Sequence, residues 1–399
     1  MNTAPQNHTA NTATTQPQVY GWCPGALRPM PSGDGLVVRI RPPGGRLTSA
    51  QAQGIAQLAS QYAWPVLDLT SRANIQLRGV ATADHPALMR ELQALQLVDT
   101  SLDAEARRNL LVTPFWQAGD GTTDLAQALT AALASPHAPT LPSKFGFALD
   151  CGESPVLRAC SADIRIERSA SGYLVCADGS PHGAPATPDE VLPLALELTH
   201  WFVDAGGVQA GRGRMAALLT NSTLPPRFST VPRRNLTPTA PPLGLVPQGC
   251  VVGFEFGQLP AETLAALGAL GPLRITPWRS LLIEGLPQLP ALDGLITQDN
   301  DARLRVAACT GAPGCSQAAG ATRVFARDWA ALVPHGQVLH VSGCSKGCAH
   351  PGATLTLVAT ATGFNLIPHG TAASAPTWRA LDAAAVASHL QHLSHAPRI

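Results

Sequence analysis

The sequence predicts an α+β protein built by tandem duplication, with two like halves around a pseudo-two-fold axis and a cleft between them. Two internal matches predict the duplication. Residues 67–79 (LDLTSRANIQLRG) align without gaps with residues 273–285 (LRITPWRSLLIEG), and residues 162–179 align with residues 353–370. The matches keep the same order in both halves, so a common origin of the halves is the simplest explanation.

Each half is expected to begin with a strand, an Ala-rich helix and a pair of strands. Apolar residues in 37–47 and 251–259 predict the first strand, and the Ala-rich runs that follow predict the helix. The aligned segments 67–79 and 273–285 indicate two strands joined by a polar turn. A helical stretch and a β-rich module complete each half. The Pro-rich stretch 225–247 predicts a linker between them.

Composition excludes several classes of protein. The net charge is +1, so there is no basic excess for binding nucleic acid. No apolar run approaches the ~18 residues of a membrane span, and the N-terminal residues 1–17 lack the apolar core of a secretory signal. We therefore expect a cytoplasmic protein, in which the 9 cysteines are metal ligands or free thiols rather than disulfides.

Four cysteines of the second half form a regular array, C-x5-C followed after 28 residues by C-x3-C, comprising Cys309, Cys315, Cys344 and Cys348. Structural zinc prefers shorter spacings, whereas these spacings and the surrounding glycines suit a chain wrapped around a [4Fe–4S] cluster. Zinc and unrelated buried thiols remain alternatives. The other five cysteines lack paired spacing and are interpreted as small core residues.

The residues resemble the nitrite and sulfite reductase family, in which two homologous halves carry this cysteine array in the second. Residues 70–76 (TSRANIQ), 108–111 (RNLL) and 141–145 (LPSKF) are similar to the family's T-x-R-x-x-x-Q, R-N-V-x and L-P-x-K-F segments. The resemblance implies a nitrite/sulfite reductase-like fold, with two ferredoxin-like half-domains and two further α+β domains. The expected boundaries are 1–17 for a disordered leader, 18–82 and 241–300 for the half-domains, and 83–240 and 301–399 for the reductase-like domains, the last carrying the cluster.

Further motifs are similar to one branch of this family, the tetrapyrrole monooxygenases of aerobic cobalamin biosynthesis. They are 21–30 (GWCPGALRPM), 41–47 (RPPGGRL) and 342–351 (SGCSKGCAHP). The family reductases have a second lysine where this sequence has Gly146, which makes reduction of a small anion less favoured. This resemblance implies hydroxylation of precorrin-3A at a meso carbon, with closure of the ring A acetate to a γ-lactone and with O2 as oxidant.

The resemblance also implies cofactors and site residues. It implies that the four cysteines hold a [4Fe–4S] cluster, that a mononuclear non-haem iron is present, and that sirohaem is absent. Arg72, Arg108, Lys144 and Lys346 are the candidates to bind substrate carboxylates, to which guanidinium and ammonium groups are suited. The catalytic residues are not identified. His340 and His350 are possible iron ligands, or structural imidazoles.

NADH is the implied source of electrons, yet the sequence carries no dinucleotide-binding fingerprint. Gly211-Arg-Gly213 lacks the third glycine of that motif. We therefore expect a separate reductase protein to deliver the electrons. Two other functions remain open: a sirohaem-dependent sulfite or nitrite reductase, and an iron–sulfur electron-transfer protein.

Overall fold

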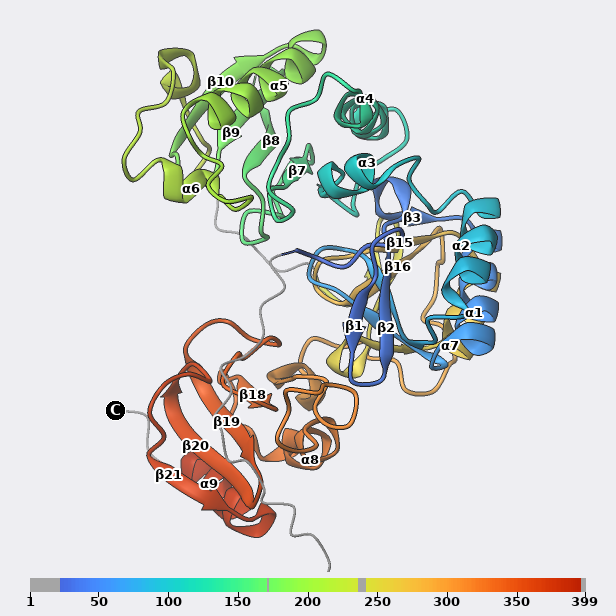
Figure 1. Ribbon diagram of the computed structural model, residues 1–399, viewed down its shortest axis with the longest axis vertical. Coiled ribbons are helices and arrows are strands. Elements are labelled where there is room, and N and C mark those ends of the chain that lie inside the picture. The colour runs from blue at the N-terminus through green and yellow to red at the C-terminus, as the bar shows by residue number, and fades with distance from the viewer. Residues whose placement is uncertain (1–21, 171, 236–241, 396–399) are drawn as a thin grey trace, which may run out of the picture. The chain divides into compact units, whose positions relative to one another are not determined.

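The computed structural model describes residues 22–170, 172–235 and 242–395 (Figure 1). The expected leader 1–17 and Gly21 of the 21–30 motif lie outside these ranges. The chain divides into two compact units, of which one is Trp22–Val306 and the other contains Ala307–Ile399. Within the described ranges, no helix is long and apolar enough to cross a bilayer.

Two matching sheets lie in the unit Trp22–Val306. The first has the order β1 (Met30–Ser32), β2 (Gly35–Ile40), β5 (Ile75–Val80), β4 (Val66–Leu69), β14 (Gln258–Pro260). The second has the order β12 (Gly244–Val246), β13 (Gly249–Gly253), β16 (Ser280–Glu284), β15 (Leu273–Ile275), β3 (Arg46–Leu47). The two sheets are built alike, and each takes its last strand from the other half of the chain. This reciprocal exchange confirms the predicted duplication.

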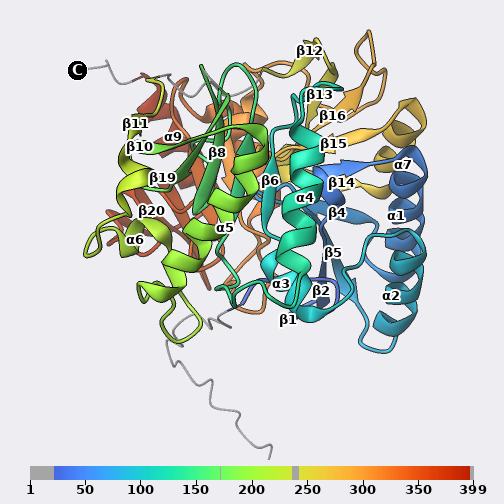
Figure 2. The same ribbon diagram turned by 90° about the horizontal axis from the view of Figure 1, so that it is seen from above.

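The helices that follow the exchanged strands pack against each other. They are α1 (Ser49–Tyr62) and α7 (Ala261–Leu270), which lie side by side in both views (Figures 1 and 2). Thr48 and Gln51 form a capping box that fixes the start of α1. A Cβ placed on Gly268 of α7 would lie 2.7 Å from the Cβ of Ala52 on α1, so the close approach of the helices requires glycine at this position.

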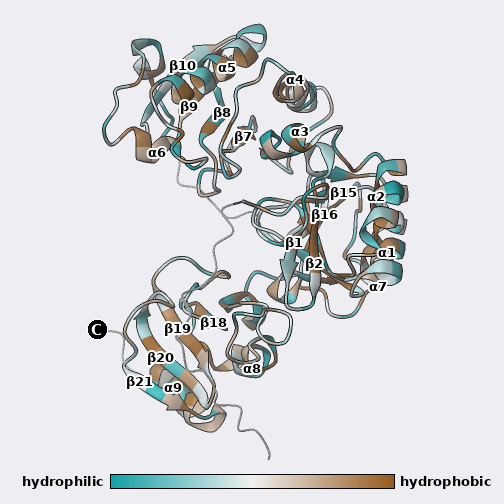
Figure 3. Ribbon diagram, in the orientation of Figure 1, coloured by the Kyte–Doolittle hydropathy of each residue, from teal (hydrophilic) through white to brown (hydrophobic). Residues whose placement is uncertain are grey.

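The two exchanged sheets share one hydrophobic core with these helices. Figure 3 shows hydrophobic colour along the central strands, as on β16, whose Leu281, Leu282 and Ile283 are fully buried. Helix α2 (His85–Ala94) packs on α1 at the edge of this core. Burial of apolar surface from both halves holds the duplicated modules together.

A third sheet has the order β11 (Val231–Pro232), β10 (His182–Ala186), β9 (Gly172–Ala177), β8 (Ile164–Ser169), β7 (Phe147–Asp150), β6 (Leu110–Val112). Strands β6, β7 and β8 are parallel, and β8, β9 and β10 are antiparallel. Helices α4 (Thr122–Ala134) and α5 (Pro188–Asp204) contribute to its core, and α3 (Leu102–Arg107) and α6 (Met215–Leu218) lie in the same unit.

The predicted linker 225–247 contains regular structure on both sides of residues 236–241, which lie outside the described ranges. A 3-10 turn spans Pro226–Ser229, and its Phe228 is fully buried in the core of the third sheet. Strand β11 pairs with β10, and β12 begins the second exchanged sheet. The proline content suggested a spacer, but one buried aromatic ring is enough to anchor the first part of this stretch.

The other unit repeats the third sheet. Its order is β17 (Val306–Ala308), β18 (Leu339–Ser342), β19 (Thr354–Thr360), β20 (Gly363–Gly370), β21 (Trp378–Leu381). Strands β18 and β19 are parallel, and β19, β20 and β21 are antiparallel, as in the strands from β7 to β10. Helix α9 (Ala383–His395) packs on β20 and β21, and α8 (Arg323–Trp329) packs on α9. The second predicted repeat is thus present as well.

Candidate functional site

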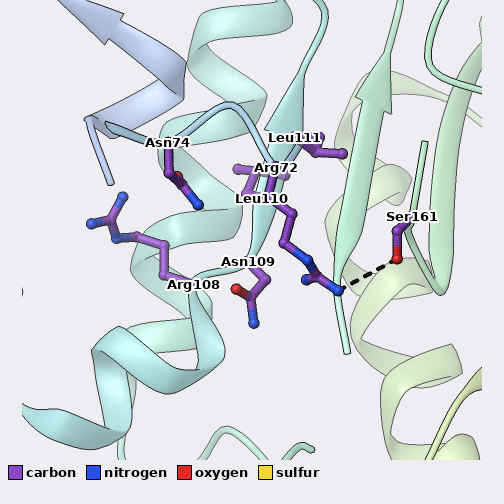
Figure 4. Close-up of a pocket in the computed structure, with 7 residues that line it drawn as sticks. All are labelled: Arg72, Asn74, Arg108, Asn109, Leu110, Leu111 and Ser161. Carbon is purple, nitrogen blue, oxygen red and sulfur yellow. Dashed lines mark hydrogen bonds between the residues drawn. The ribbon is translucent and has the colours of Figure 1, made fainter. Parts of the chain in front are cut away.

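Two of the predicted carboxylate-binding residues line one small pocket, with Asn74, Asn109, Leu110, Leu111 and Ser161 (Figure 4). Arg72 lies in the turn between β4 and β5, and Arg108 directly follows α3, shortly before β6. The two segments are distant in sequence, and the fold brings them together at this pocket. In Figure 4 the side chain of Arg72 points toward Ser161, whereas Arg108 extends to the opposite side of the pocket.

Arg72 is held by a tight turn and by the segment that contains Lys144. The Thr70 hydroxyl accepts hydrogen bonds from the backbone N–H groups of Arg72 and Asn74, at 3.3 and 3.2 Å. The Arg72 guanidinium donates to the Lys144 carbonyl at 3.1 Å and to the Ser161 hydroxyl at 3.4 Å. The backbone of Lys144 is therefore adjacent to Arg72, and the Lys144 side chain is exposed to solvent.

Arg108 already has a carboxylate partner within the protein. Its Nε and Nη2 donate to the two carboxylate oxygens of Asp99 at 2.6 and 2.9 Å, and Nη2 also donates to the Arg41 carbonyl at 2.8 Å. This planar two-bond geometry is the one that a ligand carboxylate would require. A substrate carboxylate would have to share or displace Asp99, which makes Arg108 a weaker candidate than Arg72.

Further guanidinium groups gather around Arg72. We call Arg39, Arg41, Arg72, Arg108 and Arg214 the basic cluster. Burial lowers the pKa of Arg39 to about 10, and the neighbouring Arg41 and Arg72 charges act in the same direction. Burial also lowers the pKa of Arg72, to which Arg214 contributes. A shift of this kind indicates cations that lack water and are not fully neutralised.

Three carboxylates partly balance the basic cluster in the described residues. Asp99 binds Arg108, Asp163 binds Arg214 at 2.8 Å, and the charge of Glu105 acts on Arg41. Asp163 is fully buried and also accepts hydrogen bonds from the backbone of Gly146 and Met215. The cations of the cluster outnumber these acids, and this balance suits an anionic ligand. No motif in the sequence indicates Arg214, which follows the Gly211–Gly213 segment.

The four cysteines of the array lie in the unit that contains Ala307–Ile399. Cys309 follows β17, and Cys344 and Cys348 follow β18. The two cysteine loops are joined by a hydrogen bond from the Ala319 N–H to the Gly343 carbonyl at 2.8 Å. Partial desolvation raises the pKa of the Cys348 thiol, and the charges of Cys309, Cys344 and Cys315 act in the same direction, so the four cysteines are near enough to interact.

The donor set fits a cluster better than a single metal ion. Every cysteine of the chain lies in the described ranges and is a free thiol. In those ranges, no three His, Cys, Asp or Glu side chains are close enough to hold one ion. Thiolates around a four-iron cubane are farther apart than those around one zinc ion, and the left-handed residues Gly311 and Gly347 let the chain curve around such a group. The described residues therefore offer no ligand set for a mononuclear iron.

The last predicted residue, Lys346, lies in the C-x3-C loop. It is exposed, and its charge lowers the pKa of Cys348, opposite to the effect of the neighbouring thiols. Arg72, Arg108 and Lys144 belong to one unit, whereas Lys346 and the cysteine array belong to the other.

Comparison with known proteins agrees with this architecture. Residues 28–95 match the nitrite/sulfite reductase ferredoxin-like half domain. The precorrin-3B synthase of a Sinorhizobium species is 27% identical over 406 aligned positions, covering 92% of this chain and 87% of that protein. Along most of its length, the chain is similar to that synthase and to the nitrite reductases.

Other relatives support the same family. The ferredoxin–nitrite reductase of Synechococcus elongatus is 24% identical, over 79% of this chain and 74% of that enzyme. The solved structure of the Mycobacterium tuberculosis NirA protein superposes with a TM-score of 0.62 at 16% identity, covering 89% of this chain and 79% of that one. The resemblance and the fold class predicted from the sequence are confirmed.

Proposed function

We propose that the chain is an oxidoreductase that converts precorrin-3A to precorrin-3B in cobalamin biosynthesis. The observation that carries the proposal is the similarity to a precorrin-3B synthase along nearly the whole chain. In the proposed reaction, one atom of O2 enters the substrate at the meso carbon and the other leaves as water. NADH supplies the two electrons, and the ring A acetate closes to a γ-lactone.

The basic cluster supports a polycarboxylate substrate. A precorrin carries acetate and propionate groups around its rim, and each needs a cationic partner when it leaves water. Arg39 and Arg72 supply half-buried guanidinium groups, and the charge of Arg214 acts on Arg72. Tetrapyrrole binding by this surface explains why so many cations are kept together in the first unit.

The presence of glycine at position 146 favours a ligand that is larger than nitrite or sulfite. A Cβ on Gly146 would lie 3.1 Å from the Asn109 carbonyl oxygen and 3.8 Å from Nη1 of Arg72. A side chain there would approach Asn109 and Arg72, two residues that line the pocket. The glycine leaves this space open and adds no further ammonium group for a small oxyanion.

The cysteine array would hold a [4Fe–4S] cluster, which supplies one-electron transfer when bound. The residues of this chain would position it: Cys309 and Cys315 from one loop, Cys344 and Cys348 from the other. Delivery of NADH electrons by a separate reductase completes the proposed scheme.

The deciding test is an isotope experiment. Anaerobically reconstituted protein, supplied with precorrin-3A, NADH, a ferredoxin reductase system and 18O2, should give a product that contains one 18O atom at the meso position. Product formed without 18O incorporation would overturn the oxygenase proposal.

Nitrite reduction is the second candidate, because nitrite reductases are among the relatives. Reduced methyl viologen with nitrite or sulfite distinguishes the two functions. Rapid oxidation of the dye, together with the strong visible bands of sirohaem, would favour the reductase. A broad absorption shoulder from the cluster alone, with no anion-dependent oxidation, would favour the monooxygenase.

A further inference from the structure

His340 is a fully buried histidine beneath the cysteine array. It lies on β18, two residues before the strand ends, and its Nε2 is 3.7 Å from Sγ of Cys309. Its Cε1 is 3.3 Å from the position that a Cβ on Gly347 would occupy. One imidazole therefore contacts the loop of the first cysteine pair and the loop of the second.

A second polar group approaches the same sulfur, but its hydrogen is already used. Ser342 Oγ is 3.4 Å from Sγ of Cys309, and the same hydroxyl donates to the Cys344 carbonyl at 2.7 Å. A serine hydroxyl has one hydrogen to donate. With this hydrogen on the carbonyl, Ser342 cannot also donate to the sulfur.

The protonation state of a bound cysteine fixes the direction of the remaining contact. A cysteine that ligates iron is a thiolate and can only accept a hydrogen bond. The contact between Cys309 and His340 is then an N–H···S hydrogen bond donated by Nε2. This requires the imidazole to carry its hydrogen on Nε2 when the cluster is present.

We propose that His340 is a positioning residue that raises the reduction potential of the cluster through this N–H···S hydrogen bond. The inference rests on the proposed [4Fe–4S] assignment. Reduction adds negative charge to the cluster and its sulfurs, so a fixed donor stabilises the reduced form more than the oxidised form. The donor is buried, and electrostatic interactions are stronger in such a site than in water.

A second histidine serves as a matched control. The ring of His350 lies 6.0 Å from that of His340, centroid to centroid, and its Nδ1 is 3.2 Å from the Gly352 carbonyl oxygen. It is close to the array, yet it has another hydrogen-bond partner. Substitution of His350 should change local bulk and charge without removing the donor to Cys309.

The experiment measures the midpoint potential of the reconstituted full-length protein by an EPR-monitored titration at one fixed pH. His340→Leu should lower the equilibrium constant for cluster reduction about tenfold, which is about 59 mV for one electron. His340→Gln keeps an N–H donor and should restore part of the shift. His350→Leu should leave the potential unchanged. Equal potentials in wild type and His340→Leu would overturn the inference.

A measurement on the wild type keeps the test independent of whether His340→Leu binds its cluster. Protein labelled with 15N-histidine should show a weak nitrogen hyperfine coupling to the reduced cluster, retained in His350→Leu and lost in His340→Gln. Absence of this coupling would overturn the inference about His340 and leave the cofactor assignment intact. Failure of the wild type to form a four-iron cluster would overturn the cofactor assignment as well.

Discussion

Arg46 on the exchanged strand β3 forms a two-bond ion pair with Glu284 of the other half. Its Nε and Nη2 lie 2.7 and 2.8 Å from the two carboxylate oxygens. Glu284 also accepts from Nε of Arg274 at 2.7 Å, and the guanidinium of Arg274 lies 3.5 Å from the ring centroid of Trp116. The Glu284 carboxylate thus pairs with two cations and stabilises the position of β3 in the second exchanged sheet.

Replacing Glu284 by Gln should destabilise the protein by about 2–4 kcal/mol, because buried Arg274 would lose its counter-charge. Arg46 is partly exposed and should contribute little to this loss. Urea unfolding monitored by circular dichroism measures the effect. The control is Glu197→Gln, which breaks the exposed pair with Arg227 and should change stability by less than about 0.5 kcal/mol. Equal losses of stability in the two variants would contradict the role of Glu284 as the counter-charge of Arg274.

Asp150 should make stability depend on pH. Burial raises the pKa of this carboxyl to about 6, from 3.8, although the Leu157 N–H donates to it at 2.7 Å. The folded state holds the proton more tightly than the unfolded state, so stability falls as pH rises between these two values. At pH 8, Asp150→Asn should be more stable than wild type by about 1–3 kcal/mol, with the difference shrinking toward pH 4. Thermal melting of wild type, Asp150→Asn and the control Glu197→Gln across this pH range tests whether the stability difference has the expected direction.

Much of the fold could be predicted because the duplication repeats local patterns. The strand pairs 67–79 and 273–285 correspond to β4–β5 and β15–β16. The exchange of β3 and β14 could not be predicted. These strands are short, and nothing in Arg46 or Leu47 indicates that their partners Arg274 and Leu273 lie in the other half. Strand pairing is a long-range property that a local pattern does not encode.

Only those residues of the candidate site that belong to a sequence motif could be predicted. The motifs single out Arg72 and Arg108, and both line one pocket. They could not reveal that Asp99 already binds Arg108, because that contact depends on how α3 ends. Nor could they reveal Arg214, which approaches Arg72 from a segment far along the chain. Residues that act through tertiary contacts leave no periodic signal in the sequence.

Arg72→Ala and Lys144→Ala should each weaken precorrin-3A binding by roughly ten- to a hundredfold, equivalent to a loss of ~1.5–3 kcal/mol for a charge-assisted contact. Arg108→Ala should weaken binding less and reduce stability more, because it leaves Asp99 without its partner. Anaerobic titration measures affinity, and cluster absorbance should stay unchanged in all three variants. Unaltered affinity in both Arg72→Ala and Lys144→Ala would place the substrate elsewhere.

Cys315→Ser should abolish or degrade the brown chromophore, because a serine oxygen is a poor ligand for iron in a cluster. The matched control is Cys160→Ser, since Cys160 is a half-buried thiol outside the array. Iron and sulfide analysis of both variants after reconstitution checks the prediction. A full complement of iron and sulfide in Cys315→Ser would be incompatible with the cluster ligands proposed here.

Purified protein with NADH and O2 alone should turn over precorrin-3A at least roughly tenfold more slowly than with an added ferredoxin reductase system. The physical reason is the lack of a nucleotide-binding frame around the Gly211–Gly213 segment. This segment joins α5 to the short helix α6, whereas a dinucleotide site needs a strand, a glycine turn and a long helix whose N-terminus faces the phosphates. Turnover driven by photoreduced deazaflavin is the control, since it delivers electrons without NADH and should support the reaction. Stoichiometric NADH binding to the isolated protein, with turnover independent of any added reductase, would show that the chain accepts hydride directly.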